Sequence, residues 1–172
     1  PYTPWWRKKA ESGGQAVEQA THIVDILRYL FGDPIDVYSR GRKALKAVDF
    51  ESSSETIITF PEGRIATLSV SCEKERGSRI GFTIGFADGS AEYMWNGKLS
   101  IRNSKGTATA GPENPNALYE DELSAFFKAV ETGDRSLIKS DYRDGVKTLM
   151  TTLAMNESMR KAKPVKMKNF LD

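Results

Sequence analysis

The single histidine of the chain, His22, stands four residues after a carboxylate, Glu18. Residues four apart on a helix lie on the same face, so these two side chains can contact each other. A carboxylate beside an imidazole favours its protonated form, and an imidazole that titrates near neutral pH can accept or donate a proton in catalysis. The pair therefore indicates an acid–base site, with His22 as the acid/base and Glu18 as its partner. The alternative interpretation is an ordinary pair on a solvated helix surface.

Aromatic and polar residues close to this pair are candidates for binding a substrate. Two adjacent tryptophans could stack on a sugar ring or another planar ligand, or they could fill a core. The candidate substrate-binding residues are Trp5, Trp6, Arg7, Gln15 and Gln19.

Other kinds of site find little support in the sequence. One histidine and one cysteine, Cys72, without a second ligand motif, predict no metal site and no intrachain disulfide. No glycine-rich loop follows a predicted strand and no serine stands in an elbow motif, so neither a dinucleotide fingerprint nor a serine nucleophile is indicated. The net charge of +2, without a tight Lys/Arg cluster, argues against nucleic acid as a partner.

The element that must position His22 is a helix, which we expect over residues 15–31. Apolar residues recur there at spacings of three and four, and Gly32-Asp33-Pro34 ends the pattern. Before it, residues 1–11 suggest an entry loop or a short strand, and Ser12 could help to cap the helix after the Gly13-Gly14 break. At 100° per residue, five polar residues fall within roughly 80° of one another, opposite the apolar stripe: Gln15, Glu18, His22, Asp25 and Tyr29. We therefore expect His22 to point outward.

A β-rich region follows the predicted helix. Three tight turns, Glu62-Gly63, Asp88-Gly89 and Asn96-Gly97, separate segments rich in β-branched and aromatic residues, which is typical of antiparallel hairpins. The strands are expected at 35–41, 56–61, 64–73, 79–87, 90–95 and 98–103, with a loop at 105–117 and a basic strand edge at 161–168.

Two closing helices are expected at 120–133 and 141–162. The first has Leu123, Phe126, Phe127 and Val130 on one face, and the second has Val146, Leu149, Met150, Leu153 and Met159.

The resulting fold class is α+β, with an open, mostly antiparallel sheet of about five or six strands and helices packed on one face. Residues 1–172 are expected to form a single domain for substrate binding and oligomerisation. Ile65 points to the side opposite Leu68 and Val70, so an apolar outer face predicts self-association.

The composition bears on the cellular location of the chain. It has 172 residues, 28% of them charged, and no apolar run of the roughly 18–20 residues that a membrane helix needs. One cysteine favours a reducing, cytoplasmic location, and neither a membrane nor a nucleic acid is expected as a partner. The chain opens on Pro1 and enters an aromatic segment at once, which suggests a piece of a longer protein.

The segment from the two tryptophans to residue 34, WWR…SGGQAVEQATHIVDILRYLFGDP, resembles the start of the C-terminal domain of the Gfo/Idh/MocA oxidoreductases. The family pattern is a glycine-rich turn, an acidic residue, three residues, a histidine, two residues and an aspartate, which fall here on Gly13-Gly14, Glu18, His22 and Asp25. The closing segment, DELSAFFKAVETGDRSLIKSDYRDGVKTLMTTLAMNESMRKAKPVKM, is also similar to that family.

The resemblance implies a fold like the C-terminal domain of dihydrodipicolinate reductase and a substrate pocket. It implies that His22 is the acid/base in hydride transfer between NAD or NADP and a sugar, a polyol or a related hydroxyl compound. Glu18 would orient His22 or bind substrate, and Gly13 and Gly14 would lie at the cofactor. The family usually has aspartate where Glu18 stands, which moves the carboxylate by more than about 1 Å.

In the family an N-terminal Rossmann domain binds most of the dinucleotide and supplies a lysine. That domain is absent from this sequence, so we expect the chain alone to be inactive. The family's sheets commonly pack face to face, which implies a homo-oligomer, a dimer or a tetramer, through the open sheet face. Two other functions are compatible with the same residues. One is an NAD-dependent hydrolase or epimerase that uses transient oxidation, and the other is a non-catalytic module for oligomerisation or binding.

Overall fold

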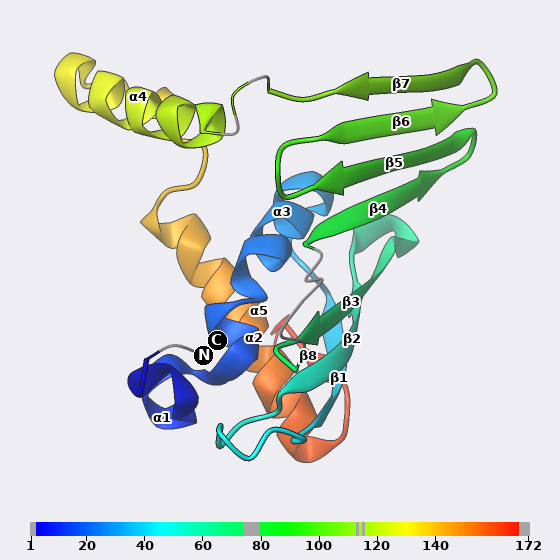
Figure 1. Ribbon diagram of the computed structural model, residues 1–172, viewed down its shortest axis with the longest axis vertical. Coiled ribbons are helices and arrows are strands. Elements are labelled where there is room, and N and C mark those ends of the chain that lie inside the picture. The colour runs from blue at the N-terminus through cyan, green and yellow to red at the C-terminus, as the bar shows by residue number, and fades with distance from the viewer. Residues whose placement is uncertain (1–2, 74–79, 113, 115, 169–172) are drawn as a thin grey trace. The chain divides into compact units, whose positions relative to one another are not determined.

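A computed structural model describes residues 3–73, 80–112, 114 and 116–168 (Figure 1). The chain divides into two compact units. The first contains the residues up to 76 and from 142 onward, and the second contains residues 77–141. The residues with candidate chemistry, His22 and Glu18, both belong to the first unit.

The first unit is built on a four-stranded antiparallel sheet with the strand order β3-β2-β1-β8. Its strands are β1 (Asp36–Arg42), β2 (Ser53–Thr59), β3 (Ile65–Ser71) and the short β8 (Val165–Lys166). β2 and β3 form the expected hairpin around Glu62-Gly63, where both residues adopt positive φ angles of 61° and 75° within the 3-10 turn Pro61–Gly63. The end of the chain returns to the sheet, because β8 pairs with β1 through Val37 and Val165.

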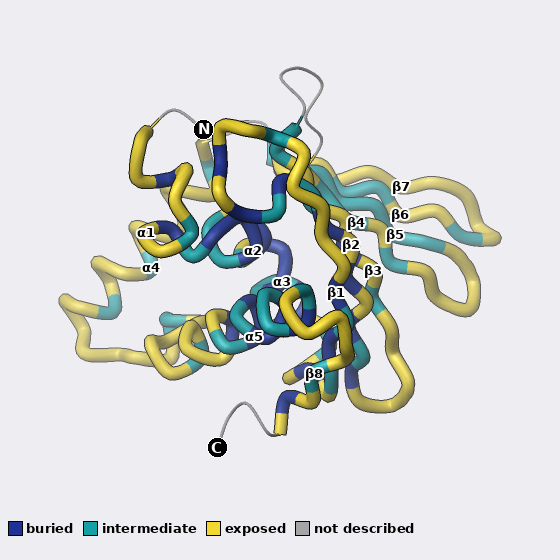
Figure 2. The backbone as a smooth tube through the Cα atoms, turned by 90° about the horizontal axis from the view of Figure 1, so that it is seen from below, coloured by how far each residue is buried: buried dark blue, intermediate teal, exposed yellow. Residues whose placement is uncertain are grey.

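Two helices form a layer on one face of this sheet: α5 (Tyr142–Lys161) packs on β1, and α3 (Thr21–Phe31) packs against α5. Figure 2 shows buried segments of β1 where it faces these helices. The apolar residues with exposed fractions below a tenth include Ile23, Val24, Leu27, Val37, Ile58, Leu68, Ala154 and Met155. Burial of these side chains is the main driving force for the layer, and it fixes which face of α3 turns away from the sheet.

The buried face of α5 differs from the sequence expectation. Val146 and Leu149 remain 39% and 42% exposed, whereas the residues buried on this helix are mostly small or hydroxylated: Thr148, Thr151, Thr152, Ala154, Met155 and Ser158. Threonine can be buried here because its hydroxyl donates to a carbonyl of the preceding turn, as Thr151 does to Lys147 (2.9 Å). The large apolar residues of α5 therefore do not mark its buried face, and the face predicted from them is wrong.

The entry segment is helical, so the expected loop or short strand over residues 1–11 is wrong for the part that the structure describes. It contains the 3-10 turn η1 (Trp5–Arg7) and the short helices α1 (Lys9–Ser12) and α2 (Gly14–Glu18). The backbone N–H of Lys9 at the start of α1 donates to the Asp49 carboxylate at 2.6 Å. Ser12 does link the two short helices, since its hydroxyl accepts the N–H of Gly14 at 3.0 Å.

The single helix expected over residues 15–31 is divided into α2 and α3. At the break, the N–H groups of both Gln19 and Ala20 donate to the carbonyl of Gln15, at 2.9 and 3.1 Å. The N–H of Ala20 donates to a carbonyl five residues earlier, whereas an α-helical N–H donates to the carbonyl four residues earlier. This wider bond ends α2 and lets α3 start in a new direction. A uniform rotation of 100° per residue therefore does not hold across residues 19 and 20.

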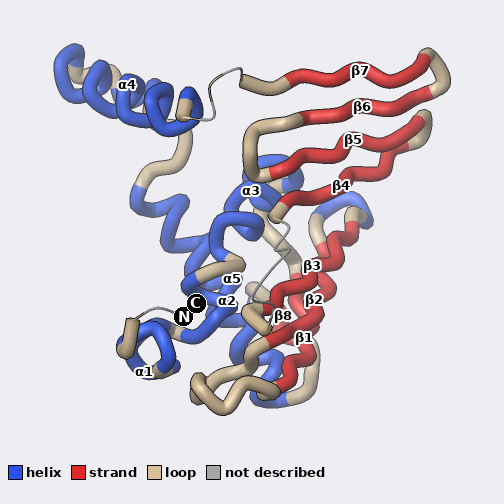
Figure 3. The backbone as a smooth tube through the Cα atoms, in the orientation of Figure 1, coloured by secondary structure: helices blue, strands red, loops and turns tan. Residues whose placement is uncertain are grey.

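The second unit contains a four-stranded antiparallel meander, ordered β4-β5-β6-β7 (Figure 3). Its elements are β4 (Gly81–Phe86), β5 (Gly89–Met94), β6 (Leu99–Asn103), β7 (Gly106–Ala110), α4 (Ala117–Thr132) and the 3-10 turn η3 (Arg135–Leu137). The turns at Asp88-Gly89 and Asn96-Gly97 join the strands as the sequence predicts. The expected loop over 105–117 is wrong in its first part, because the alternating Thr-Ala segment forms β7 against β6.

One face of this meander is apolar. The strand register places Phe82, Tyr93, Leu99 and Ala110 in one row and Ile84, Ala91, Ile101 and Ala108 in the next. The rings of Phe82 and Tyr93 stack with centroids 5.2 Å apart. α4 does not bury its own apolar face, since Phe126 and Phe127 are 53% and 59% exposed and none of its residues is buried. The expected packing of this helix is therefore not found.

The α+β class and the antiparallel pairing are confirmed. The strands form two four-stranded sheets, however, where one sheet of about five or six strands was expected. Turn residues identify which neighbouring strands form a hairpin, but sheet membership depends on backbone pairing between hairpins, which turn chemistry does not encode.

Candidate functional site

His22 lies on the exposed side of α3, one residue after the helix begins at Thr21. The adjacent Ile23 and Val24 turn inward and are 9% and 1% exposed. The outward position of His22 is therefore the one expected from the sequence. A side chain in this place can reach a ligand without any change in the packed layer beneath it.

Glu18 is the last residue of α2, so the break between the helices separates it from His22. Its side chain is half-buried, and its carboxylate is held by two N–H donors. The indole Nε1 of Trp6 donates to Oε2 at 2.6 Å, and the amide of the neighbouring Gln19 donates to the same oxygen. The Glu18 carboxylate is therefore held by hydrogen bonds from Trp6 and Gln19, and its position does not depend on the helix alone.

The two tryptophans have different environments. Trp6 is 8% exposed and packs its ring edge-on against Phe50, with centroids 5.1 Å apart. Trp5 is 46% exposed, as a residue that contacts a ligand would be. Arg7 and Gln19 are also exposed. Of the two interpretations offered by the sequence, Trp6 fits the core, and Trp5 is exposed enough to contact a ligand.

Gln15 does not lie on the outward stripe where the sequence placed it. It is 5% exposed and its amide faces the sheet edge. In the orientation that satisfies both amide atoms, the nitrogen donates to the Ser52 carbonyl at 2.9 Å and the oxygen accepts from the N–H groups of Ser71 and Cys72 at 3.3 and 2.8 Å. The break at residues 19 and 20 explains the difference, because it rotates α2 relative to α3.

The glycine pair does not fit a dinucleotide phosphate. Gly13 and Gly14 both have left-handed φ angles, of 76° and 79°. A Cβ on Gly13 would lie 2.7 Å from Val17, and one on Gly14 would lie 3.3 Å from Phe50. The N–H of Gly14 already donates to Ser12. These glycines permit a tight junction between two short helices, and their backbone is not arranged as a phosphate cradle.

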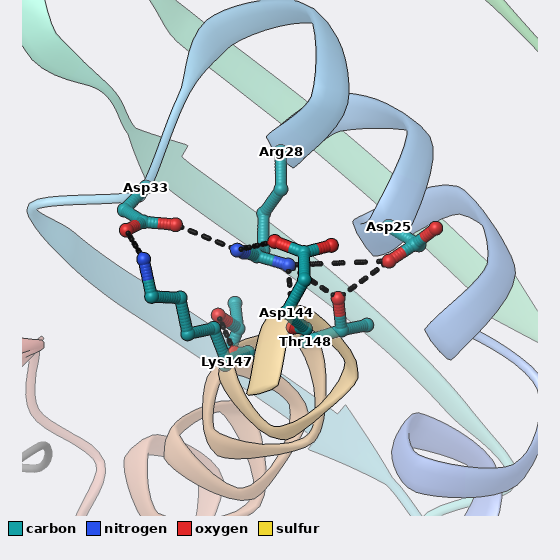
Figure 4. A network of polar contacts seen from close by, with 7 residues as sticks. Asp25, Arg28, Asp33, Asp144, Lys147 and Thr148 are labelled. Carbon is teal, nitrogen blue, oxygen red and sulfur yellow. Dashed lines mark hydrogen bonds and ion pairs between the residues drawn. The ribbon is translucent and has the colours of Figure 1, made fainter. Parts of the chain in front are cut away.

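A second cluster of polar side chains, which no motif or spacing in the sequence predicted, joins α3 to α5 (Figure 4). The guanidinium of Arg28, 6% exposed, donates to the carboxylates of Asp33 and Asp144 at 2.7 and 2.8 Å. It also donates to the Thr148 hydroxyl at 2.6 Å, and that hydroxyl donates to Asp25 at 2.6 Å. This Arg28 network holds the helix that carries His22 in place.

Charge and burial oppose each other in the Arg28 network. Burial alone would lower the pKa of Arg28, but hydrogen bonds to Asp144 and Asp33 outweigh it and hold the pKa above its ordinary value. Burial would likewise raise the pKa of Asp33, but hydrogen bonds from Lys147 and Arg28 hold it below its ordinary value. The sequence did contain a signal, since position 28 lies four residues after Val24 on the apolar stripe. A charge on such a stripe indicates a buried partner.

Within the described ranges, no three His, Cys, Asp or Glu side chains are grouped as ligands of one metal ion. In the same ranges, no helix combines the length and apolar character that crossing a membrane requires.

Comparison with known proteins places these features in context. A family model described as the GFO/IDH/MocA C-terminal domain matches residues 1–92, a little over half of the chain, including η1, α2 and α3. UNK4.17, an uncharacterized protein of Schizosaccharomyces pombe, is 29% identical over 184 residues, which cover 90% of this chain and 44% of that protein.

Solved structures share the fold. Levoglucosan dehydrogenase in complex with NADH and L-sorbose matches with a TM-score of 0.85 and 21% identity, over 97% of this chain and 53% of that one. An oxidoreductase from Agrobacterium radiobacter in complex with NAD+, L-tartaric acid and magnesium matches with a TM-score of 0.79 and 14% identity, over 97% and 52%. This chain therefore spans about half the length of the proteins that it matches.

Proposed function

Because this chain belongs to the GFO/IDH/MocA C-terminal domain family, we propose that it forms the substrate side of an NAD(P)-dependent oxidoreductase. The substrate would be a sugar, a polyol or a related hydroxyl compound. The observation that carries the proposal is the position of His22. It is the chain's single imidazole, it is exposed on α3, and it follows a carboxylate that two N–H donors hold. Complexes of similar proteins with L-sorbose and L-tartaric acid support the substrate class.

Oxidation of an alcohol to a carbonyl removes a proton from the oxygen and a hydride from the carbon. Of these two transfers, the residues of this chain can carry out the transfer of the proton. Neutral His22 accepts it from the substrate hydroxyl, and Glu18 orients the imidazole or binds a second hydroxyl. Trp5 offers an exposed ring to the sugar, and Arg7 and Gln19 are also exposed.

The nicotinamide dinucleotide, as NAD or NADP, would be bound by residues outside this chain. The glycine pair at 13 and 14 does not fit its phosphates, because the Gly14 N–H has a partner and both Cβ positions are close to other side chains. We therefore assign to this chain the recognition of the hydroxyl compound and the proton step alone.

The proposed function is tested by measuring NAD(P)H formation over a panel of sugars, polyols and hydroxy acids with the full-length protein. We expect turnover on at least one member of the panel, and none from the isolated 172-residue chain. Release of a product without net NAD(P)H would indicate a hydrolase or epimerase that oxidises its substrate transiently. Absence of any conversion, with cofactor binding intact, would contradict the proposal.

We also propose that the protein self-associates through the apolar face of the β4–β7 meander. That face is a continuous set of apolar side chains in register, and Phe86 and Ile101 on it are 46% and 37% exposed. A second copy of the same face would remove them from water. Light scattering is expected to show a dimer or a tetramer, and replacing Ile101 with lysine should weaken it. A monomer at tens of micromolar would contradict this arrangement.

A further inference from the structure

The indole of Trp6 makes a direct contact with the carboxylate that the proposed function places beside the acid/base. Its Nε1–H donates to Glu18 Oε2 at 2.6 Å, across 12 residues of sequence. A hydrogen bond from N–H to a carboxylate is shorter and stronger than one between neutral groups. Trp6 therefore restrains the position of the Glu18 carboxylate.

The ring of Trp6 is itself held firmly. It is 8% exposed and belongs to a small core with Val48 and Phe50, against which Leu45 and Cys72 also pack. Its edge-on contact with the Phe50 ring fixes the orientation of the indole. A tryptophan has only two rotatable side-chain bonds, so a buried ring leaves Nε1 little freedom to move.

The backbone beside Trp6 is also anchored. The N–H of Asp49 donates to the Arg7 carbonyl at 3.1 Å, and the carboxylate of Asp49 accepts the N–H of Lys9 at 2.6 Å. The ammonium of Lys9 pairs with Glu51 at 2.8 Å. These contacts join the turn that carries Trp6 to the segment that leads into β2. The Nε1–H group is therefore a fixed hydrogen-bond donor.

We propose that Trp6 is a positioning residue for Glu18, which deepens and rests on the proposed function. Trp6 and Gln19 both donate to Oε2, so neither of these two contacts uses Oε1, the oxygen that we assign to His22 or the substrate. Trp5 has the separate role of contacting the ligand. Glutamate is required at position 18, because aspartate would withdraw the carboxylate by more than about 1 Å and break the bond to Nε1.

The kinetic test compares Trp6→Phe with Trp5→Phe in the full-length protein. Trp6→Phe keeps the aromatic ring and removes the N–H, and we expect kcat to fall about tenfold with an altered pH profile and little change in KM. Trp5→Phe should leave the pH profile unchanged. Glu18→Asp should reproduce the effect of Trp6→Phe, and the double variant should lose no more activity than either alone. Losses that multiply in the double variant would overturn the proposal.

A physical test does not depend on turnover. In 15N-labelled protein, the Trp6 indole N–H resonance should shift when Glu18 becomes Asp or Gln, while that of Trp5 stays in place. These two substitutions leave the Trp6 core untouched, so they remain informative if Trp6→Phe lowers the stability. An unchanged Trp6 resonance would overturn the positioning role. A shifted resonance in a protein without oxidoreductase activity would instead retain the Trp6–Glu18 contact and reject the proposed function.

Discussion

Replacing His22 with alanine in the full-length protein is expected to reduce turnover by about 10²–10⁴-fold, the usual loss when a general acid/base is removed. The substrate hydroxyl would then lose the imidazole that accepts its proton. Cofactor affinity should not change, since the proposed function assigns dinucleotide binding to residues outside this chain. Because His22 is exposed, its loss should change the free energy of unfolding by no more than about 0.5 kcal/mol.

A matched control separates the loss of the imidazole from a general effect of substitutions on α3. Tyr29→Ala is the matched control, because Tyr29 is 73% exposed on the same helix and has no assigned chemistry. Full activity in His22→Ala would show that another group moves the proton or that this face of α3 is not catalytic.

The sequence predicted the features that depend on local chemistry. The end of α3 at Gly32, the Asp88-Gly89 and Asn96-Gly97 turns and the outward side of α3 all follow from turn residues and helical spacing. It failed where tertiary contacts override the local pattern. The helix break after Glu18 moved Gln15 from the expected surface to a buried contact with the sheet edge, which no periodicity could show.

The candidate site shows the same division. The types and spacing of Glu18 and His22 identified the pair, but the Trp6 hydrogen bond that holds Glu18 depends on a chain reversal through two short helices. The sequence did not reveal the Arg28 network, because the three carboxylates near Arg28 come from different places in the sequence. Asp25 lies on α3, Asp33 follows that helix and Asp144 lies on α5. A sequence shows that a charged residue falls on an apolar helix face. It does not show which residues pair with that charge and so allow its burial.

The Arg28 network predicts an asymmetry in stability. The side chain of Arg28 is 4% exposed, whereas those of Asp33 and Asp144 are 43% and 42% exposed. Removing both carboxylates, as Asp33→Asn with Asp144→Asn, leaves the buried cation only the longer ion pair with Asp25 at 3.9 Å and should destabilise the protein by about 3–5 kcal/mol. Arg28→Met leaves carboxylates that water can reach, and it also removes the buried, unpartnered Nε. It should therefore cost less, about 1–3 kcal/mol.

Chemical denaturation at neutral pH measures both variants, with Glu11→Gln as the control. Glu11 pairs with Lys8 at 2.8 Å on the surface, so its replacement should change the unfolding free energy by less than about 1 kcal/mol. Equal losses in Arg28→Met and the double aspartate variant would show that the hydrogen bonds, and not the stranded charge, decide the stability.

Acid titration tests the same network in the wild type. The pKa of Asp33 is lowered in the folded protein from an ordinary value of 3.8, because the hydrogen bonds from Lys147 and Arg28 outweigh the effect of burial. Its stabilising contribution is therefore fully present above about pH 3.8 and is lost as the pH falls through the lower, folded-state pKa. In the Asp33→Asn variant this part of the acid dependence should disappear. An unchanged loss of stability below pH 4 in that variant would mean that Asp33 is not stabilised by its cations in solution. α3, with His22 on it, would then depend on apolar packing alone for its position.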